Sequence, residues 1–397
     1  MKINLSRRVS QIKPSPTLSL SAAANLLKAS GKPIINLTVG EPDFDTPEPI
    51  KQAARLALDQ GFTKYTAVDG ILRLKQAVIQ KFKLENQLDY ALDQVIISSG
   101  AKQSIYNLMQ SLLNPGDEVI IPSPYWVSYP DMALLAEAKP VFISSSIDSG
   151  LKITPQQLDL AINEKTRLFI INSPSNPTGM VYTQTELNQL AKVLLRHPSL
   201  FILTDDIYEH IYWGNEPFKN ILNVCPELYD RTLVLNGCSK AYAMTGWRIG
   251  YAAGPKEVIR AMTNIQSQST SNPNSIAQLA ATAALTGSQD CVQHMNEIYH
   301  QRHTFFSAGL NKIPGVQCLS AQGAFYCFPS FHAFIGDNKK FVSDYELADY
   351  LLNKANVATV PGSAFGAPGY LRLSYALDNA SLEKALIQLK AALVGLT

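Results

Sequence analysis

The chain has 397 residues, of which 46% are hydrophobic and 17% charged, and its formal net charge is +2. This composition is typical of a folded enzyme and excludes a disordered chain, while the length allows two domains with a large buried core. No dense Lys/Arg tract points to nucleic acid, and no run approaches the roughly twenty apolar residues of a membrane span.

The first 45 residues, which include Gly40-Glu41-Pro42-Asp43-Phe44, are too few to form a core alone. Beyond them, short apolar runs predict buried strands. These runs lie at 95–97, 118–121, 168–171, 200–203 and 233–235. Helical patterns separate most of them, one through Ile105 and Leu113 and another through Leu187 and Leu194. Strand–helix alternation predicts a doubly wound, largely parallel α/β sheet whose strand C-termini carry the site.

From about residue 290 the pattern changes. A long helix is predicted through Met295 to Leu310, and 323–326, 357–362 and 371–375 read as strands of a smaller α+β unit. We therefore expect a large cofactor-binding domain over residues 46–290. A small domain should combine residues 1–45 with residues 291–397. No Gly/Ser-rich linker marks the boundary, so the two should pack closely.

The five cysteines are scattered and lack metal-type spacing. They fit free thiols in a reducing cytoplasm, so we expect a cytoplasmic protein without a metal site. The short Ser6-Arg7-Arg8 stretch is not followed by the apolar run of a signal peptide.

Lys240 follows the predicted strand at 233–235 and lies among small and hydroxyl-bearing residues. Such a lysine can form an imine with an aldehyde, and Arg248 can hold a phosphate. Upstream, the runs 173–179 and 205–208 add an amide, a carboxylate and a phenol. Each residue alone has a plainer interpretation, since a lone lysine is usually a solvated charge. The ordered set contains the groups needed to hold pyridoxal phosphate.

The run Ser98-Ser99-Gly100-Ala101-Lys102 opens the helix through Ile105. We expect Gly100, Ala101 and Lys102 to offer free backbone N–H groups to the phosphate at this helix N-terminus. Taken alone, such a turn is more often a plain strand–helix connection.

With residues 39–47 near the N-terminus and 372–375 near the C-terminus, these motifs resemble the class I aminotransferases of pyridoxal-phosphate fold type I. The resemblance spans nearly the whole chain and is strongest to the bacterial aspartate and aspartate/prephenate aminotransferases. It is very specific for the cofactor, pyridoxal 5′-phosphate, and for amino transfer, and less specific for the substrate.

The resemblance implies that Lys240 binds the cofactor and then moves the proton of the substrate Cα. Asp205 is implied to keep the pyridine nitrogen protonated. Its neighbour Asp206 is a rival, because alternation along a strand would send the two side chains to opposite sides. The family pattern favours Asp205.

Tyr208 and Asn176 are implied to hydrogen-bond the phenolic oxygen of the cofactor, and Trp126 to stack on its ring. Singly, these residues are more often core aromatics or a turn-forming Asn-Pro. Ser239 is implied to join Arg248 at the phosphate. Tyr65 matches the position that reaches the partner's phosphate, which implies a homodimer with sites at the interface.

Arg372 is implied to bind the substrate α-carboxylate, with the backbone at Gly40 close to the same group. Asn176 and Trp126 are also expected beside the substrate. Animal and enteric aspartate aminotransferases bind the distal carboxylate with a partner arginine, but no Arg or Lys occurs between Arg260 and Arg302. The resemblance offers other residues for this role. They are Lys102 and Lys13, with Thr17 nearby.

The predicted reaction is ping-pong transfer of the amino group of L-aspartate to 2-oxoglutarate, with prephenate or aromatic oxo acids as further acceptors. Two alternatives share the fold: an aminotransferase for aromatic amino acids or kynurenine, and a carbon–sulfur β-lyase that releases pyruvate and ammonia. A transcription regulator with an aminotransferase-like domain is disfavoured. Only about 35 residues precede the Gly40 motif, too few for a DNA-binding domain.

Overall fold

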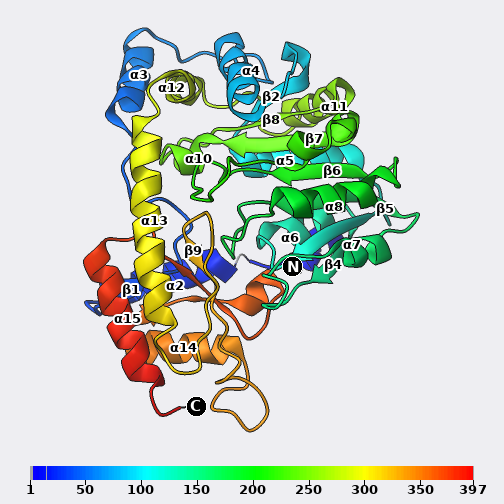
Figure 1. Cartoon of the computed structure of the whole chain (residues 1–397). Coiled ribbons are helices and arrows are strands. Elements are labelled where there is room, and N and C mark those ends of the chain that lie inside the picture. Colours follow the sequence, from blue (N-terminus) through cyan, green and yellow to red (C-terminus); the bar gives the residue numbers. More distant parts are fainter. Residues whose placement is uncertain (1–2, 15, 397) are drawn as a thin grey trace.

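A computed structural model describes residues 3–14 and 16–396 of the chain (Figure 1). Its centre is a seven-stranded sheet in the order β2-β8-β7-β6-β5-β3-β4. The strands are β2 (Val95–Ser98), β3 (Glu118–Ser123), β4 (Lys139–Ser144), β5 (Thr166–Asn172), β6 (Phe201–Asp205), β7 (Thr232–Gly237) and β8 (Gly250–Ala253). All neighbours pair in parallel except β8, which is antiparallel to both β2 and β7. The predicted doubly wound, mostly parallel sheet is therefore confirmed.

Two strands of the sheet were not predicted. β4 lies at the edge and exposes Lys139, Phe142 and Ser144, so it shows no continuous apolar run. β8 consists of small residues around one tyrosine. A Cβ on Gly250 would stand 2.1 Å from the backbone nitrogen of Ala101. Gly250 therefore allows the helix after β2 to lie directly on β8. The pattern of apolar residues does not record this contact, so it did not predict β8.

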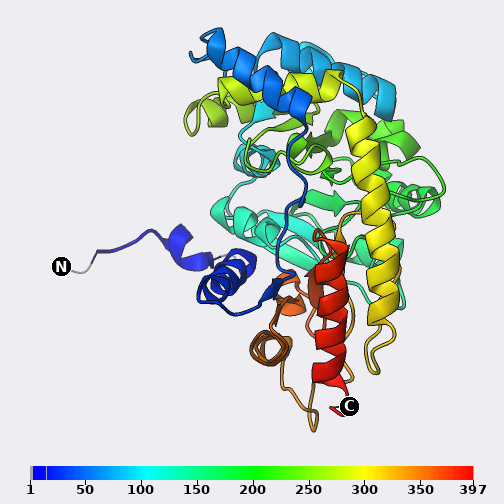
Figure 2. The same ribbon diagram turned by 90° about the vertical axis from the view of Figure 1, so that its left-hand side faces the viewer.

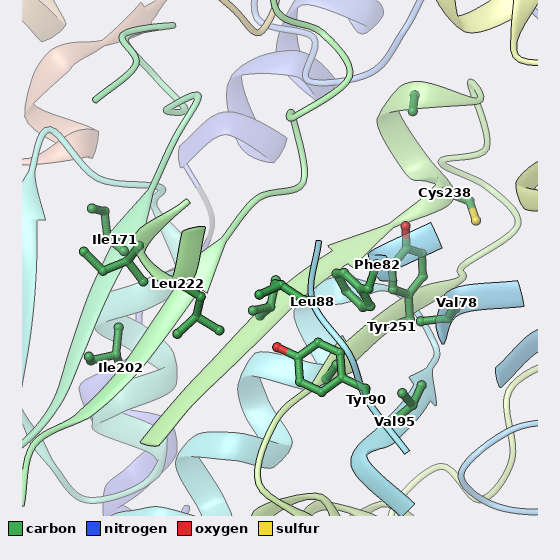
Figure 3. Close-up of a cluster of buried hydrophobic side chains, with 14 of the residues drawn as sticks. Val78, Phe82, Leu88, Tyr90, Val95, Ile171, Ile202, Leu222, Cys238 and Tyr251 are labelled. Atoms are coloured by element: carbon green, nitrogen blue, oxygen red, sulfur yellow. The ribbon is translucent and has the colours of Figure 1, made fainter. Parts of the chain in front are cut away.

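Side chains alternate between the two faces of the sheet, and helices cover both. Val95 and Ile97 belong to one core cluster, and Ile96 between them belongs to another. Helices α4 (Leu72–Asn86), α8 (Gln184–Leu195) and α12 (Ser275–Thr286) pack on the first, part of which Figure 3 shows. Helices α5 (Ala101–Leu112), α6 (Ser128–Leu135) and α11 (Lys256–Ser267) pack on the second. The predicted helices through Ile105 and Leu187 correspond to α5 and α8.

Local sequence signals start several of these helices. Thr183 precedes α8, and its hydroxyl accepts a hydrogen bond from the Glu186 N–H at 3.2 Å. The Glu186 carboxylate in turn accepts from the Thr183 N–H at 2.7 Å. This reciprocal pair satisfies two backbone donors that the helix itself leaves free. The other helices beside the large sheet are α3 (Glu48–Asp59), α7 (Pro155–Ala161), α9 (Ile221–Val224) and α10 (Cys238–Ala241).

The C-terminal part builds a second core around short strands. β9 (Tyr326–Cys327), β12 (Leu371–Ser374) and β11 (Val360–Pro361) pair antiparallel, and β1 (Ile35–Asn36) pairs in parallel with β10 (Val357–Ala358). Helices α13 (Asp290–Leu310), α14 (Asp344–Ala355) and α15 (Asn379–Leu393) cover these strands (Figure 1). The predicted strand at 323–326 is shorter than expected and shifted to Tyr326–Cys327.

The described part of the first 45 residues contacts the second core at several places. β1 joins β10, and the Asp43 carboxylate pairs with Arg302 of α13 at 2.8 Å. Helix α2 (Pro16–Ala29) contacts β10 and β11, whereas α1 (Arg7–Gln11) lies near α6 with all its residues exposed. Figure 2 shows α1 projecting from the body of the chain. The N-terminal segment therefore touches both parts of the protein.

Helix α13 connects the two cores. Its Val292 belongs to the core of the large sheet, whereas Met295 and later residues belong to the second core. The domain limits at residues 45/46 and 290/291 stay a prediction. Within residues 3–14 and 16–396, no helix has both the length and the apolar character that crossing a membrane requires.

Candidate active site

A cavity of about 410 Å³ opens where the strand ends of the large sheet face the second core and the N-terminal segment. Most of the predicted site residues line it. They are Thr17, Gly40, Ala101, Lys102, Trp126, Asn176, Asp205, Tyr208, Ser239, Lys240, Arg248 and Arg372. Gly100, Tyr65 and Lys13 are not part of this lining. Residues more than 350 positions apart thus meet in one place.

Lys240 lies in the short helix α10, which begins directly after β7. Its Nζ donates to the carbonyl oxygen of Gly40 at 2.5 Å and stands 5.7 Å from the ring centroids of Tyr208 and Phe325. Burial, followed by the charges of Arg372 and Arg248, lowers the pKa of Lys240 to about 8. About a tenth of this amine is then neutral at pH 7, which a nucleophile requires.

Asp205 ends β6 and faces the cavity. Its carboxylate accepts from the Tyr129 hydroxyl at 2.5 Å and from the Ile207 N–H at 3.3 Å. Burial raises the pKa of Asp205 to about 6. No cation lies within ion-pair distance of it among residues 3–14 and 16–396. A buried carboxylate in this state favours a positively charged ligand group beside it.

Asp206 lies on the other side of the chain, fully buried and outside the cavity. Its carboxylate accepts from Thr204 Oγ1 at 2.6 Å and from Asn220 Nδ2 at 2.7 Å. Burial raises the pKa of Asp206 to about 7. Strand alternation thus separates the two aspartates in the way the sequence allowed, and only Asp205 can meet a ligand in the cavity.

The prediction that the Gly100 N–H is free was wrong. This N–H donates to the Ser98 carbonyl oxygen at 2.7 Å, whereas the N–H groups of Ala101 and Lys102 have no acceptor in the described chain. Gly100 serves another purpose, with φ at +88° and no room for a side chain. A Cβ there would stand 2.3 Å from Nη2 of Arg248. Gly100 therefore lets the guanidinium lie against the start of α5.

This end of the cavity suits a phosphate. Arg248 donates through Nη1 to the Thr245 carbonyl oxygen at 3.0 Å, which leaves other guanidinium donors available. The first N–H groups of α5 add the positive end of a helix. Ser239, at the start of α10, also lines the cavity and offers a hydroxyl.

Arg372 lies at another part of the cavity wall and is 2% exposed. Its Nη2 donates to the Thr38 carbonyl oxygen at 2.7 Å and its Nη1 to Asn176 Oδ1 at 3.1 Å. The guanidinium stacks on the Tyr326 ring at 4.6 Å. No carboxylate in the described residues pairs with it, and its Nε has no partner there. Because an unpaired buried charge is costly, this position favours an anionic ligand.

Sequence reasoning missed two tyrosines of the site. The Tyr326 hydroxyl lies 2.8 Å from the Tyr208 hydroxyl, and Tyr129 donates to Asp205. Tyr129 stands three residues after Trp126 in a turn where its N–H donates to the Trp126 carbonyl oxygen at 3.1 Å, so the position of Trp126 was a signal for it. Tyr326 comes from a two-residue strand, and no local motif distinguishes it.

The predicted cations have unequal positions. Lys102 Nζ lies 4.9 Å above the Trp126 ring and forms no ion pair within residues 3–14 and 16–396. Burial and the Arg248 charge lower the pKa of Lys102. Lys13 is exposed and lies outside the cavity. Burial raises the pKa of the Asp131 carboxyl on α6, and the backbone N–H and charge of Lys13 partly oppose that rise. The expected place of Lys13 beside the substrate is therefore not found.

Thr17 does line the cavity, and its buried hydroxyl has no partner in the described chain. Tyr65 is 92% exposed and contacts no part of this cavity. Tyr65 therefore does not reach the cavity of its own chain.

Comparisons with known proteins agree with this geometry. The family model for "Aminotransferase class I and II" matches residues 32–389. An aspartate/prephenate aminotransferase of Nitrosomonas europaea is 54% identical, with 98% of this chain and 100% of the relative covered. The crystal structure of an aspartate aminotransferase from Rhizobium meliloti superimposes with a TM-score of 0.96 at 46% identity and covers 100% of both chains. The Thermus thermophilus aspartate aminotransferase with maleate gives 0.93 at 41% identity, over 99% of this chain and 100% of that one.

Proposed function

This chain belongs to the class I and II aminotransferases, and we propose that it exchanges amino groups between L-aspartate and 2-oxoglutarate. The observation that carries the substrate class is the buried guanidinium of Arg372 in a cavity that also holds the ammonium of Lys102. Neither cation forms an ion pair with a carboxylate of the described residues. Two cations suit a dicarboxylate. The names of the relatives support aspartate, and one of them adds prephenate.

The enzyme uses pyridoxal 5′-phosphate, and the cavity fits this cofactor. The start of α5, Ser239 and Arg248 would hold the phosphate, and Asp205 would meet the ring nitrogen. Tyr208 and the amide nitrogen of Asn176 would donate to the phenolic oxygen, since Arg372 already occupies the Asn176 carbonyl. Trp126 would cover the ring. When bound, the cofactor supplies an aldehyde for covalent attachment and a ring that accepts electrons.

Lys240 then serves as the general base and acid of the reaction. With the cofactor bound, its lowered pKa would leave an amine that takes the proton from the substrate Cα and moves it to the cofactor carbon C4′. The Gly40 carbonyl oxygen restrains the ammonium at 2.5 Å. Asp205, held by Tyr129, keeps a negative charge in place for the ring nitrogen.

We propose that the functional unit is a homodimer. Tyr65 is exposed, and it matches the family position whose side chain reaches the cofactor phosphate of the partner subunit. Lys240→Ala chains mixed with Tyr65→Phe chains would form dimers in which one site is spared both changes. We expect activity to rise on mixing, above the mean of the two variants. A fully active monomer at low concentration would contradict the dimer.

A half-reaction screen tests the substrate. The absorbance of the bound cofactor is followed while each amino acid is added alone. Aspartate and glutamate should bleach it fastest, with phenylalanine and tyrosine slower. Faster bleaching by aromatic amino acids or kynurenine would select the alternative aminotransferase. Release of pyruvate and ammonia from sulfur-containing amino acids would select the β-lyase.

We also propose a cytoplasmic location, which the five free cysteines support.

A further inference from the structure

Behind the cavity, a buried polar group of four residues connects helix α4 to two strand ends of the site. We call it the Glu209 cluster, and its members are Lys81, Asn86, Glu209 and Asn236. None of the four lines the cavity. The side chains of Lys81 and Glu209 are only 1% and 4% exposed. Such groups are costly to bury, so the contacts they make need a reason.

The Glu209 carboxylate accepts three hydrogen bonds. Lys81 Nζ donates to Oε1, Asn236 Nδ2 donates to the same oxygen at 2.7 Å, and Asn86 Nδ2 donates to Oε2 at 2.8 Å. Lys81 also donates to Asn86 Oδ1 at 2.7 Å. The carboxylate is thus neutralised by one ammonium and fixed by two amides. Towards the surface, Glu85 and His210 continue the cluster.

The two residues of the Glu209–Asn236 hydrogen bond lie next to residues of the site in the sequence. Glu209 is adjacent to Tyr208, and Asn236 lies four residues before Lys240. Glu209 directly follows Tyr208, in a turn where its N–H donates to the Asp206 carbonyl oxygen at 2.9 Å. Asn236 lies near the end of β7, and its Oδ1 accepts from the Gly237 N–H at 2.7 Å. The helix that carries Lys240 begins at the next residue. The bond therefore links the backbone that places Tyr208 to the backbone that places Lys240.

We propose that Glu209 is a positioning residue, which sets Lys240 relative to Tyr208 through its hydrogen bond to Asn236. Lys81 and Asn86 hold the carboxylate in place for this bond. The inference rests on the role proposed for Lys240. Borohydride mapping of that lysine in the unmodified protein tests the role separately. An adduct on another lysine would reject the role proposed for Lys240. The observed hydrogen bond between Glu209 and Asn236 would not be affected by that result.

Two charge-neutral double variants isolate the bond. Lys81→Met with Glu209→Gln removes both buried charges and keeps an amide oxygen for Asn236. Lys81→Met with Glu209→Met removes the same charges and the acceptor as well. Thermal unfolding of both, loaded with pyridoxal phosphate, checks that they fold equally well. The readouts are kcat, KM for aspartate, and the pH midpoint at which the absorbance of the lysine-bound cofactor changes.

We expect the glutamine pair to stay within about twofold of the wild type in kcat. The methionine pair should lose about tenfold in kcat with little change in KM, because misplacing a reacting group costs rate more than binding. Its absorbance midpoint should shift by about half a pH unit. Asn236→Ala, which removes the other end of the bond, should give the same shift. Identical midpoints and kcat in the two pairs, or an unshifted midpoint in Asn236→Ala, would overturn the proposal.

Discussion

The two ends of the cavity are built differently. At the sheet end, Asp205 ends β6 and Lys240 lies in the helix directly after β7. Both strands are fixed by hydrogen bonds to neighbours on both sides. At the other end, Thr17 comes from a segment that touches both cores and has only a two-residue strand of its own. Lys13 precedes it on the same segment. Every predicted residue on a sheet strand or the helix after it was found at or beside the cavity. Lys13, from the connecting segment, was not.

The electrostatics follow the same division. At the sheet end, burial moves the pKa of Asp205 up to about 6 and that of Lys240 down to about 8. Lys13 is exposed and lies outside the cavity. We therefore expect the chemical steps at the sheet end, where Asp205 and Lys240 lie. Substitutions at the sheet end should accordingly have the larger effects.

The largest effect should come from Lys240→Ala. This variant should fold normally but show no turnover, because no other amine replaces the one that binds the cofactor and moves the proton. Circular dichroism and thermal unfolding check the fold. Borohydride reduction of the unmodified protein followed by peptide mapping should find the cofactor on Lys240. An adduct on any other lysine would reject the assignment.

Asp205→Asn should lower kcat by several orders of magnitude while the cofactor still binds, because the ring nitrogen loses the anion that keeps it protonated. Asp206→Asn is the matched control, since it removes the same charge from the next residue. Its partners Thr204 and Asn220 can also bond an amide, so the rate should fall far less. Steady-state kinetics and absorbance spectra of both variants measure this. A reversed order would mean that the strand faces are misassigned.

The lowered pKa of Lys240 predicts a pH profile for the protein freed of cofactor. A lowered pKa means that the neutral amine appears at a lower pH than in an ordinary lysine. Acetylation of Lys240 by acetic anhydride, followed by mass spectrometry, should therefore rise about fiftyfold from pH 6 to pH 8. It should level off above a midpoint near pH 8. An exposed lysine such as Lys340 serves as the internal control. A rate that still climbs at pH 10 would contradict the burial argument.

The smallest effects should come from the two lysines proposed to bind the substrate, Lys102 on α5 and Lys13 on the N-terminal segment. Lys102→Ala should raise KM for aspartate and 2-oxoglutarate, with a loss of about ten- to a hundredfold in kcat/KM, because a charge-assisted contact is removed. Lys13→Ala should do so more weakly, since Lys13 lies outside the cavity. Activity on phenylalanine is the control and should change much less. Equal losses for acidic and aromatic substrates would show that Lys102 serves the cofactor instead.

Glu209 lies outside both ends and shows what the sequence motifs could not reveal. The Asp205–Tyr208 run identified a carboxylate and a phenol by their chemistry. Nothing in it distinguishes Glu209, one residue later, from a surface glutamate. Its function depends on Lys81 and Asn236, which are 128 residues before it and 27 residues after it along the chain. Only the packing of α4 against the strand ends brings the three together.

The sequence by itself predicted five of the seven strands and their largely parallel sheet, because apolar runs bounded by helical patterns leave few other ways to bury them. It also determined most of the cavity, since the carboxyl ends of parallel strands lie at one edge. Tertiary structure alone decided what depends on contacts between distant segments. Gly100 makes room for Arg248, Tyr326 reaches Tyr208, and Lys13 lies away from the cavity. Local patterns record which way a side chain points along its own element, but not which other element comes to meet it.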